Sequence, residues 1–375
     1  MACACKSRNW PKKNGRITPP LHLPPDDGAY CYTPLRLNSK GACDIVCARE
    51  GRDFPMKWRM VVAGVLCVVC AMAASGAMAQ GAAGGVTAQS APAQSAPAAK
   101  KLKVYISVDM EGIAGVVTGD QLGPAGFEYG RFREFMTREA LAAVQAAREA
   151  GATEILVSDS HGNGENLLIE QFPPEVRIIR SWPRRLSMMA GIDETFDAVL
   201  FIGYHASTDN VWGVRAHTFS SATLTHVALN GTAVSEGAWA AAIAGHFGVP
   251  VVFVAGDDAA VAEVKALVGP LESVETKRSL GFHSANTLTP QAACDQIAQK
   301  VKTALVRLKD FKPYRMTTPV TLDISFKQYL QTEVAAYLPM VERTGPHSIR
   351  VRLRDMVEAS SFMTFLTTYE PGLAP

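Results

Sequence analysis

Short apolar segments alternate with helical segments between Lys101 and Leu308, and this alternation limits the possible folds more than any other feature of the chain. The apolar segments are predicted to be strands, at 103–108, 154–157, 176–179, 198–202 and 251–255. The helical segments lie between and after them, at 132–150, 236–247, 257–268 and 289–308. Strands that alternate with helices predict an α/β fold, in which a mostly parallel sheet lies between two layers of helices.

The end of the chain has a different pattern. After Pro313 the predicted elements are a strand, a helix, a strand and a helix, at 319–326, 328–338, 348–353 and 356–369. We therefore expect a three-layer α/β domain over residues 101–312 and a smaller C-terminal α+β unit over residues 313–375. Asn230-Gly231, between two apolar runs, also predicts a β-hairpin.

The first hundred residues have the composition of targeting and linker segments. Lys57 and Arg59 precede an apolar run at 61–74, and Ala77-Met78-Ala79 follows it, so residues 56–79 are predicted to be a signal peptide. A membrane anchor is the alternative, for which the apolar run is short. We expect translation to begin at Met56, which would make residues 1–55 a disordered leader outside the expressed protein. Residues 80–100, rich in Ala, Ser and Pro, are expected to form a flexible linker.

The signal-peptide pattern predicts a periplasmic or secreted protein with no stable membrane insertion after the signal peptide is removed. Seven of the eight cysteines precede Gln80, so only Cys294 would remain and no internal disulfide is expected. Eleven of the 37 Lys and Arg and five of the 35 Asp and Glu also precede Gln80, which leaves 26 basic and 30 acidic residues, a net charge of −4. That balance gives no indication of nucleic-acid binding.

Polar side chains follow three of the predicted strands at the point where each strand ends. Asp109 and Glu111 follow the first strand, His161 follows the second, and His205 follows the strand at 198–202. Because the carboxyl ends of parallel strands meet at one edge of a sheet, we expect these side chains to lie close together. Carboxylates and imidazoles without cysteines suit zinc, manganese or cobalt, and several carboxylates favour two ions.

Taken singly, each of these residues also has an ordinary structural explanation. An aspartate after a strand is often a turn or capping residue, and Glu236 suits the positive end of the helix that it opens. Asp159 is expected either to orient His161 or a metal-bound group, or to serve as a helix cap or turn residue. The sequence alone gives His217 no special role, and four further histidines are expected to be structural: His226, His246, His283 and His347.

Six motifs in series resemble the D-aminopeptidase family of binuclear zinc metallopeptidases. They are SVDMEG (107–112), SDSHG (158–162), GYHA (203–206), AHTFS (216–220), LNGTAVSEGA (229–238) and VAGDD (254–258). The resemblance implies two zinc ions bridged by Asp109, with further ligands from Glu111, His161, His205 and Glu236. It implies that His217 is the catalytic nucleophile or base, and that the chain forms a homo-oligomer, a decameric ring. The implied substrates are short peptides with an N-terminal D-amino acid, D-Ala-D-Ala among them.

The implied chemistry is peptide hydrolysis by a water whose pKa two metal ions lower. We favour His217 as a general acid and base over direct attack, because a metal-activated water is already a competent nucleophile. Two other classes of function stay open. One is a two-metal hydrolase of another substrate, such as a phosphoesterase or amidase, and the other is a non-catalytic periplasmic protein that binds peptides or metals.

Overall fold

A computed structural model describes residues 101–369 of the chain. The expected leader (1–55), signal peptide (56–79) and linker (80–100) lie outside the described residues. Within 101–369, no helix combines the length and the apolar character that crossing a membrane requires.

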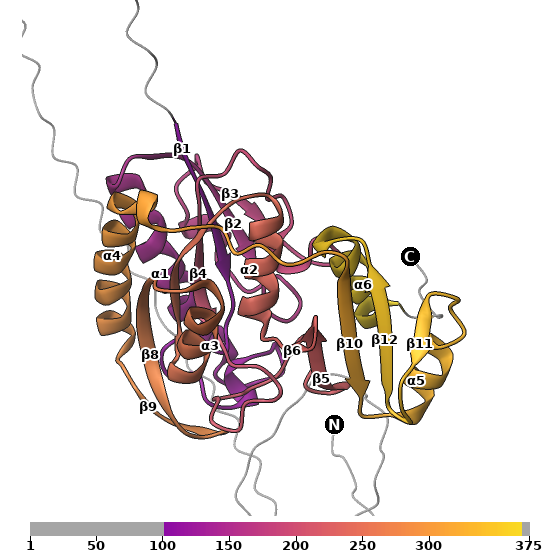
Figure 1. The fold of residues 1–375 in the computed structure, drawn as a ribbon. Helices are drawn as coiled ribbons and strands as arrows, with labels where there is room; N and C mark the ends of the chain where they lie inside the picture. Colours follow the sequence, from indigo (N-terminus) through magenta and orange to yellow (C-terminus); the bar gives the residue numbers. More distant parts are fainter. Residues whose placement is uncertain (1–100, 370–375) are drawn as a thin grey trace, which may run out of the picture. The chain divides into compact units, whose positions relative to one another are not determined.

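A seven-stranded sheet forms the centre of the described region, in the order β3-β2-β1-β4-β7-β8-β9 (Figure 1). Its strands are β1 (Leu102–Val108), β2 (Ala152–Asp159), β3 (Arg177–Ile179), β4 (Ala198–Tyr204), β7 (Val251–Asp257), β8 (Glu272–Gly281) and β9 (Ser284–Thr287). All neighbouring pairs are parallel except β8 and β9. The chain order reverses between β1 and β4, which is where open α/β sheets bind ligands.

Helices cover both faces of this sheet (Figure 1), so the expected three-layer α/β fold is confirmed. The helices are α1 (Tyr129–Glu149) and α4 (Pro290–Val306) on one face, and α2 (Glu236–His246) and α3 (Asp258–Val268) on the other. Alternate residues of β1 point to opposite faces of the sheet and pack in two different hydrophobic cores. Val104 and Ile106 pack in the cluster that contains α1 and α4, whereas Tyr105 packs in the cluster that contains α2 and α3.

A second, antiparallel sheet has the order β11-β12-β10-β5-β6. Its strands are β5 (Leu224–Leu229), β6 (Thr232–Ala233), β10 (Val320–Phe326), β11 (Val341–Arg343) and β12 (Ser348–Leu353). Asn230 and Gly231 both have positive φ, at 49° and 81°, as the expected two-residue hairpin requires. Because β5 pairs with β10, this sheet includes residues from both sides of the boundary expected at 312/313.

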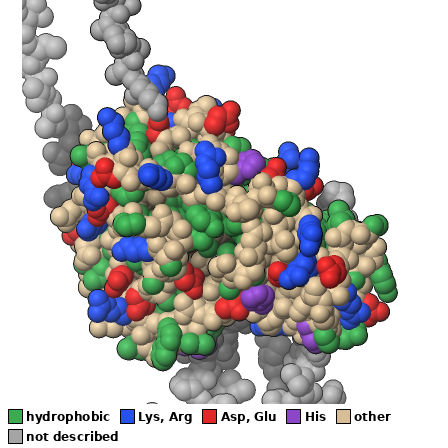
Figure 2. Space-filling view, viewed as in Figure 1, with side chains coloured by type: hydrophobic (Ala, Val, Ile, Leu, Met, Phe, Trp, Pro, Cys, Tyr) green, Lys and Arg blue, Asp and Glu red, His purple; other side chains and the backbone are tan. Residues whose placement is uncertain are grey.

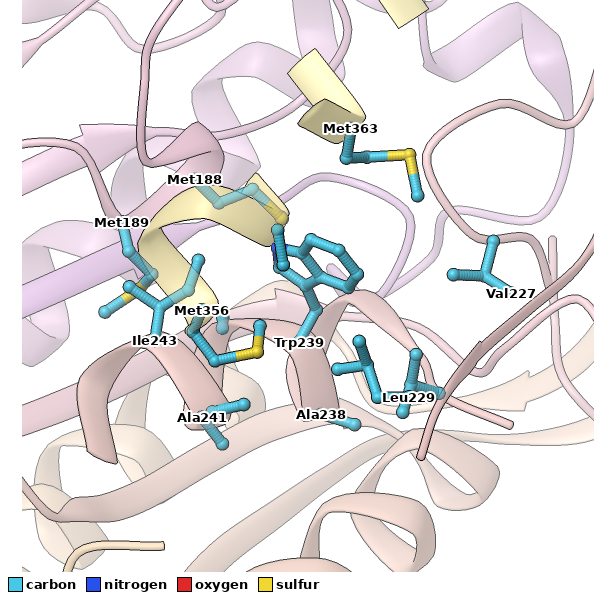
Figure 3. Close-up of a cluster of buried hydrophobic side chains, with 14 of the residues drawn as sticks. Met188, Met189, Val227, Leu229, Ala238, Trp239, Ala241, Ile243, Met356 and Met363 are labelled. Carbon is cyan, nitrogen blue, oxygen red and sulfur yellow. The ribbon is translucent and has the colours of Figure 1, made fainter. Parts of the chain in front are cut away.

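The remaining helices are α5 (Tyr329–Ala335) and α6 (Met356–Thr368). Figure 3 shows Trp239 of α2 together with methionines from the turn at 187–189 and from α6, namely Met188, Met356 and Met363. The core on this face of the central sheet therefore continues into the C-terminal region.

Strands β8, β9 and β11 are absent from the sequence prediction, which placed no element between 268 and 289. β8 carries four charged residues, Glu272, Glu275, Lys277 and Arg278, and its burial alternates only over part of its length. A half-exposed strand near the edge of a sheet lacks the apolar run that marks a central strand. Lys277 of β8 nevertheless donates hydrogen bonds to the segment that carries Asp109 and Glu111.

Candidate metal centre

The candidate site lies at the carboxyl ends of β1, β2 and β4. Asp109 directly follows β1, His161 lies two residues beyond β2, and His205 directly follows β4. The register pairs Val108 with both Asp159 and Ile202, so the three strands end side by side. The sheet therefore brings these side chains to one edge, as the sequence predicted.

Glu236 reaches the same edge from the first turn of α2. The Ser235 hydroxyl caps this helix by accepting a hydrogen bond from the Ala238 N–H at 3.3 Å. Glu236 Oε1 accepts one from the Phe219 N–H at 2.8 Å, which ties it to the loop that carries His217. The turn of chain that follows β4 thus places His217 beside Glu236.

Six side chains form two adjacent groups, each with three candidate ligand atoms within 4.8 Å of one another: Asp109, Glu111 and His161 in one, and His205, His217 and Glu236 in the other. Asp109 lies between them. Its Oδ1 is 3.4 Å from His161 Nδ1, and its Oδ2 is 3.4 Å from His205 Nε2. A carboxylate in this position can contribute one oxygen to each group.

The other distances are equally short. Glu111 Oε2 lies 2.9 Å from His161 Nδ1, and Glu236 Oε1 lies 3.5 Å from His205 Nε2. His217 Nε2 is 3.6 Å from Glu236 Oε1 and 4.0 Å from Glu111 Oε1. The rings of His205 and His217 stack at 4.1 Å between centroids. His217 therefore contacts carboxylates of both groups.

Each of the three imidazoles is oriented by a backbone carbonyl. His161 Nε2 lies 2.6 Å from Leu122 O, His205 Nδ1 lies 3.0 Å from Ala206 O, and His217 Nδ1 lies 2.9 Å from Arg215 O. A carbonyl only accepts hydrogen bonds, so the nitrogen that faces it carries the proton. In a neutral ring the opposite nitrogen then presents a lone pair to the carboxylates, which is the usual arrangement of a metal-binding histidine.

These residues fit divalent cations. A lone pair that faces a carboxylate repels it unless a proton or a metal ion lies between them. Asp109 Oδ2 and His205 Nε2 are buried and have no hydrogen-bond partner in the described structure. Burial alone would lower the pKa of His161 and His205, but the neighbouring carboxylates raise the pKa of both well above the usual range. A divalent cation between these nitrogens and carboxylates would remove the repulsion between them.

Asp159 makes no hydrogen bond to the His161 ring among the described residues and is linked to His161 through Asn166. Its Oδ2 accepts hydrogen bonds from the Asn166 and Leu167 N–H groups at 2.6 and 2.7 Å. The Asn166 side chain donates to Asp159 Oδ1 at 2.8 Å and to the His161 carbonyl at 2.7 Å. Asp159 therefore organises the turn that follows His161, which is the alternative that the sequence left open.

A cavity of about 260 Å³ opens over five of the six residues, all except His205. Trp182, Met188 and Phe219 supply apolar surface, and the last turns of α6 supply three threonines, Thr364, Thr367 and Thr368. The Trp182 indole is held by a 2.7 Å hydrogen bond to the Gly162 carbonyl, next to His161. The sequence did not predict this wall, because the residues that form it are of ordinary types and meet only in the folded chain.

An α/β fold with paired carboxylate and imidazole groups at the carboxyl edge of its sheet is typical of metal-dependent hydrolases. A family model described as D-aminopeptidase matches residues 102–365. The chain therefore belongs to the D-aminopeptidase family and is a peptidase, which confirms the resemblance seen in its motifs.

Two relatives illustrate the match. The D-aminopeptidase of Bacillus subtilis (strain 168) is 34% identical over 267 residues, which cover 71% of this chain and 97% of that protein. A solved structure described as the Zn-dependent D-aminopeptidase DppA from Bacillus subtilis, a self-compartmentalizing protease, matches with a TM-score of 0.68 and 33% identity. That match covers 72% of this chain and all of the other (100%).

Proposed function

We propose that the chain is a zinc-dependent aminopeptidase that hydrolyses short peptides with an N-terminal D-amino acid, such as D-Ala-D-Ala, at a centre of two zinc ions. The observation that supports this most strongly is the pair of adjacent ligand groups around Asp109. The zinc dependence of the related structure and the names of both relatives point the same way.

The proposed ligands divide between two ions. Glu111 and His161 would hold one ion, His205 and Glu236 the other, and Asp109 would bridge them. When bound, zinc ions supply a Lewis acid for the scissile carbonyl and lower the pKa of water. The carboxylates around them also offer negative charge to the free α-ammonium of a peptide, which suits an enzyme that acts at the N-terminus.

His217 has the position of a general acid and base. Its side chain is 17% exposed, compared with 1% for His205 and 7% for His161, and it lines the cavity. With Nδ1 bonded to the Arg215 carbonyl, Nε2 is free to take a proton from water and to return it to the leaving amine. An alternative catalytic role for His217 is direct attack by Nε2 on the substrate. If His217 has no catalytic role, the alternative is that it is a metal ligand.

The cavity wall suits the first residue of a small peptide. Its volume of about 260 Å³ accommodates a short substrate, and Trp182 and Met188 offer apolar contact beside the ligands. We place the N-terminal side chain of the peptide against this wall.

A homo-oligomer, in the form of a decamer, is part of the proposal. The related structure is described as self-compartmentalizing. In addition, α5 and the turn after it expose apolar side chains at helical spacing: Leu330 (68%), Val334 (53%) and Tyr337 (74%). Figure 2 shows hydrophobic side chains at the right-hand edge, on the side where Figure 1 places α5. We also propose a periplasmic or secreted location, from the signal-peptide pattern at 56–79.

The test is hydrolysis of D-Ala-D-Ala and of L-Ala-L-Ala by the purified protein, after chelation and again after zinc is added back. The proposal expects cleavage of the D-peptide only, and only with zinc. Cleavage of neither peptide by protein that holds two metal ions would redirect the search to another substrate class. Protein that binds no metal and cleaves neither would instead favour a non-catalytic peptide-binding role.

A further inference from the structure

A buried lysine of β8 has no place in the chemistry described so far. Lys277 is 1% exposed, and its Nζ donates three hydrogen bonds to backbone carbonyls. The acceptors are Glu111 O, Ile113 O at 2.9 Å and Val116 O at 2.6 Å. All three lie in residues 109–116, called here the ligand loop because it carries Asp109 and Glu111.

Three other side chains also form hydrogen bonds with backbone groups of the ligand loop. Glu139 of α1 accepts from the Ala114 N–H at 2.9 Å, and Thr287 of β9 accepts from the Gly115 N–H at 2.8 Å. Thr276 of β8 donates to the Gly112 carbonyl at 2.5 Å. The loop is therefore held from β8, β9 and α1.

The loop also packs closely against β4. The Gly112 N–H donates to the Gly203 carbonyl at 2.7 Å, and a Cβ at Gly112 would lie 2.0 Å from the Tyr204 carbonyl oxygen. Because β4 fixes one side of the loop, the direction of the Glu111 side chain depends on how Lys277 holds the three carbonyls on the other side.

We propose that Lys277 is a positioning residue, which holds the ligand loop in the conformation that brings Asp109 and Glu111 to the metal centre. The proposal rests on the proposed zinc-dependent function. Three carbonyl oxygens that converge on one point repel one another, and a compact ammonium with three donors satisfies all of them. The carboxylates of Asp257, Glu139, Glu111 and Asp109 offset part of the cost of burying it.

A neutral side chain at this position would leave the three carbonyls without their common donor. The loop would then relax, and the 2.9 Å contact between Glu111 Oε2 and His161 Nδ1 would lengthen. Changes to groups that orient metal ligands typically lower metal affinity by about 10- to 100-fold. The expected defect is thus in metal binding and not in stability alone.

The test compares Lys277→Met with Val301→Ala in the full-length protein. Val301 is buried in the C-terminal half of α4, and its apolar side chain forms no hydrogen bond with the ligand loop, so its truncation is a control for lost stability. Zinc affinity is measured by competition with a chelator, and the visible spectrum of the cobalt-substituted protein reports ligand geometry. We expect Lys277→Met to lower zinc affinity at least about 10-fold and to alter the cobalt spectrum. Val301→Ala should change neither.

Lys277→Gln, which keeps two donors without the charge, serves if the methionine variant does not fold, and its zinc affinity should be intermediate. Wild-type zinc affinity and cobalt spectrum in a folded Lys277 variant would overturn the proposal. A wild-type protein that binds no zinc would instead overturn the proposed function, so the two failures are distinguishable.

Discussion

Glu139→Gln is expected to change how stability depends on pH. Glu139 is buried in α1, and burial raises the pKa of its carboxyl from 4.5 to about 7, against the opposing effects of the Ala114 N–H and Lys277. A carboxyl whose pKa is higher in the folded state stabilises the protein below its unfolded pKa. That stability is lost as the pH rises from about 4.5 through about 7.

The size of the effect follows from the shift. At about 1.4 kcal/mol per pKa unit, the wild type loses about 2 to 3 kcal/mol between pH 5 and pH 8 through this one group. Glutamine does not titrate, and its carbonyl can still accept from the Ala114 N–H. Relative to the wild type, the free energy of unfolding of the variant should therefore rise by about 2 to 3 kcal/mol between pH 5 and pH 8.

The assay is urea unfolding of both proteins at pH 5 and pH 8, with chelator present so that metal binding does not contribute. Glu134→Gln on the exposed face of the same helix is the matched control, and its difference from the wild type should not change with pH. If the difference in unfolding free energy between Glu139→Gln and the wild type is equal at the two pH values, burial does not raise the pKa of Glu139.

Three further predictions concern the site. His217→Ala should retain both metal ions, measured by elemental analysis, and lose about 100-fold or more in kcat; loss of a metal ion would make His217 a ligand. Asp109→Asn should lower the affinity for both ions together, measured by chelator competition, because one carboxylate faces both groups; loss of one ion only would contradict the bridging role. Trp182→Ala should raise KM several-fold with a smaller change in kcat, whereas an unchanged KM would remove Trp182 from the peptide site.

Much of the fold could be predicted because its signals are local. The apolar runs of β1, β4 and β7 and the cap and proline of α4 lie within a few neighbouring residues. β8 lacks such a run, because only three of its residues are buried and two of these, Thr276 and Lys277, are polar. The pairing of β5 with β10 joins residues about a hundred positions apart, and no local pattern records it.

The candidate site was predictable where the topology alone brings residues together. Asp109, His161 and His205 end neighbouring parallel strands, so their convergence follows from the sheet. His217 and Glu236 reach the site through loops and a helix start, and only the family resemblance singled them out. The Leu122 carbonyl and the ammonium of Lys277 gave no signal, because a backbone oxygen has no sequence identity and a lysine is usually exposed.

The proposed function depends on two metal ions that share Asp109. Anomalous diffraction at the zinc edge, from crystals of the protein grown with zinc, locates the ions. We expect two peaks, one beside Glu111 and His161 and one beside His205 and Glu236, with Asp109 between them. A single peak, or two peaks away from these residues, would contradict it.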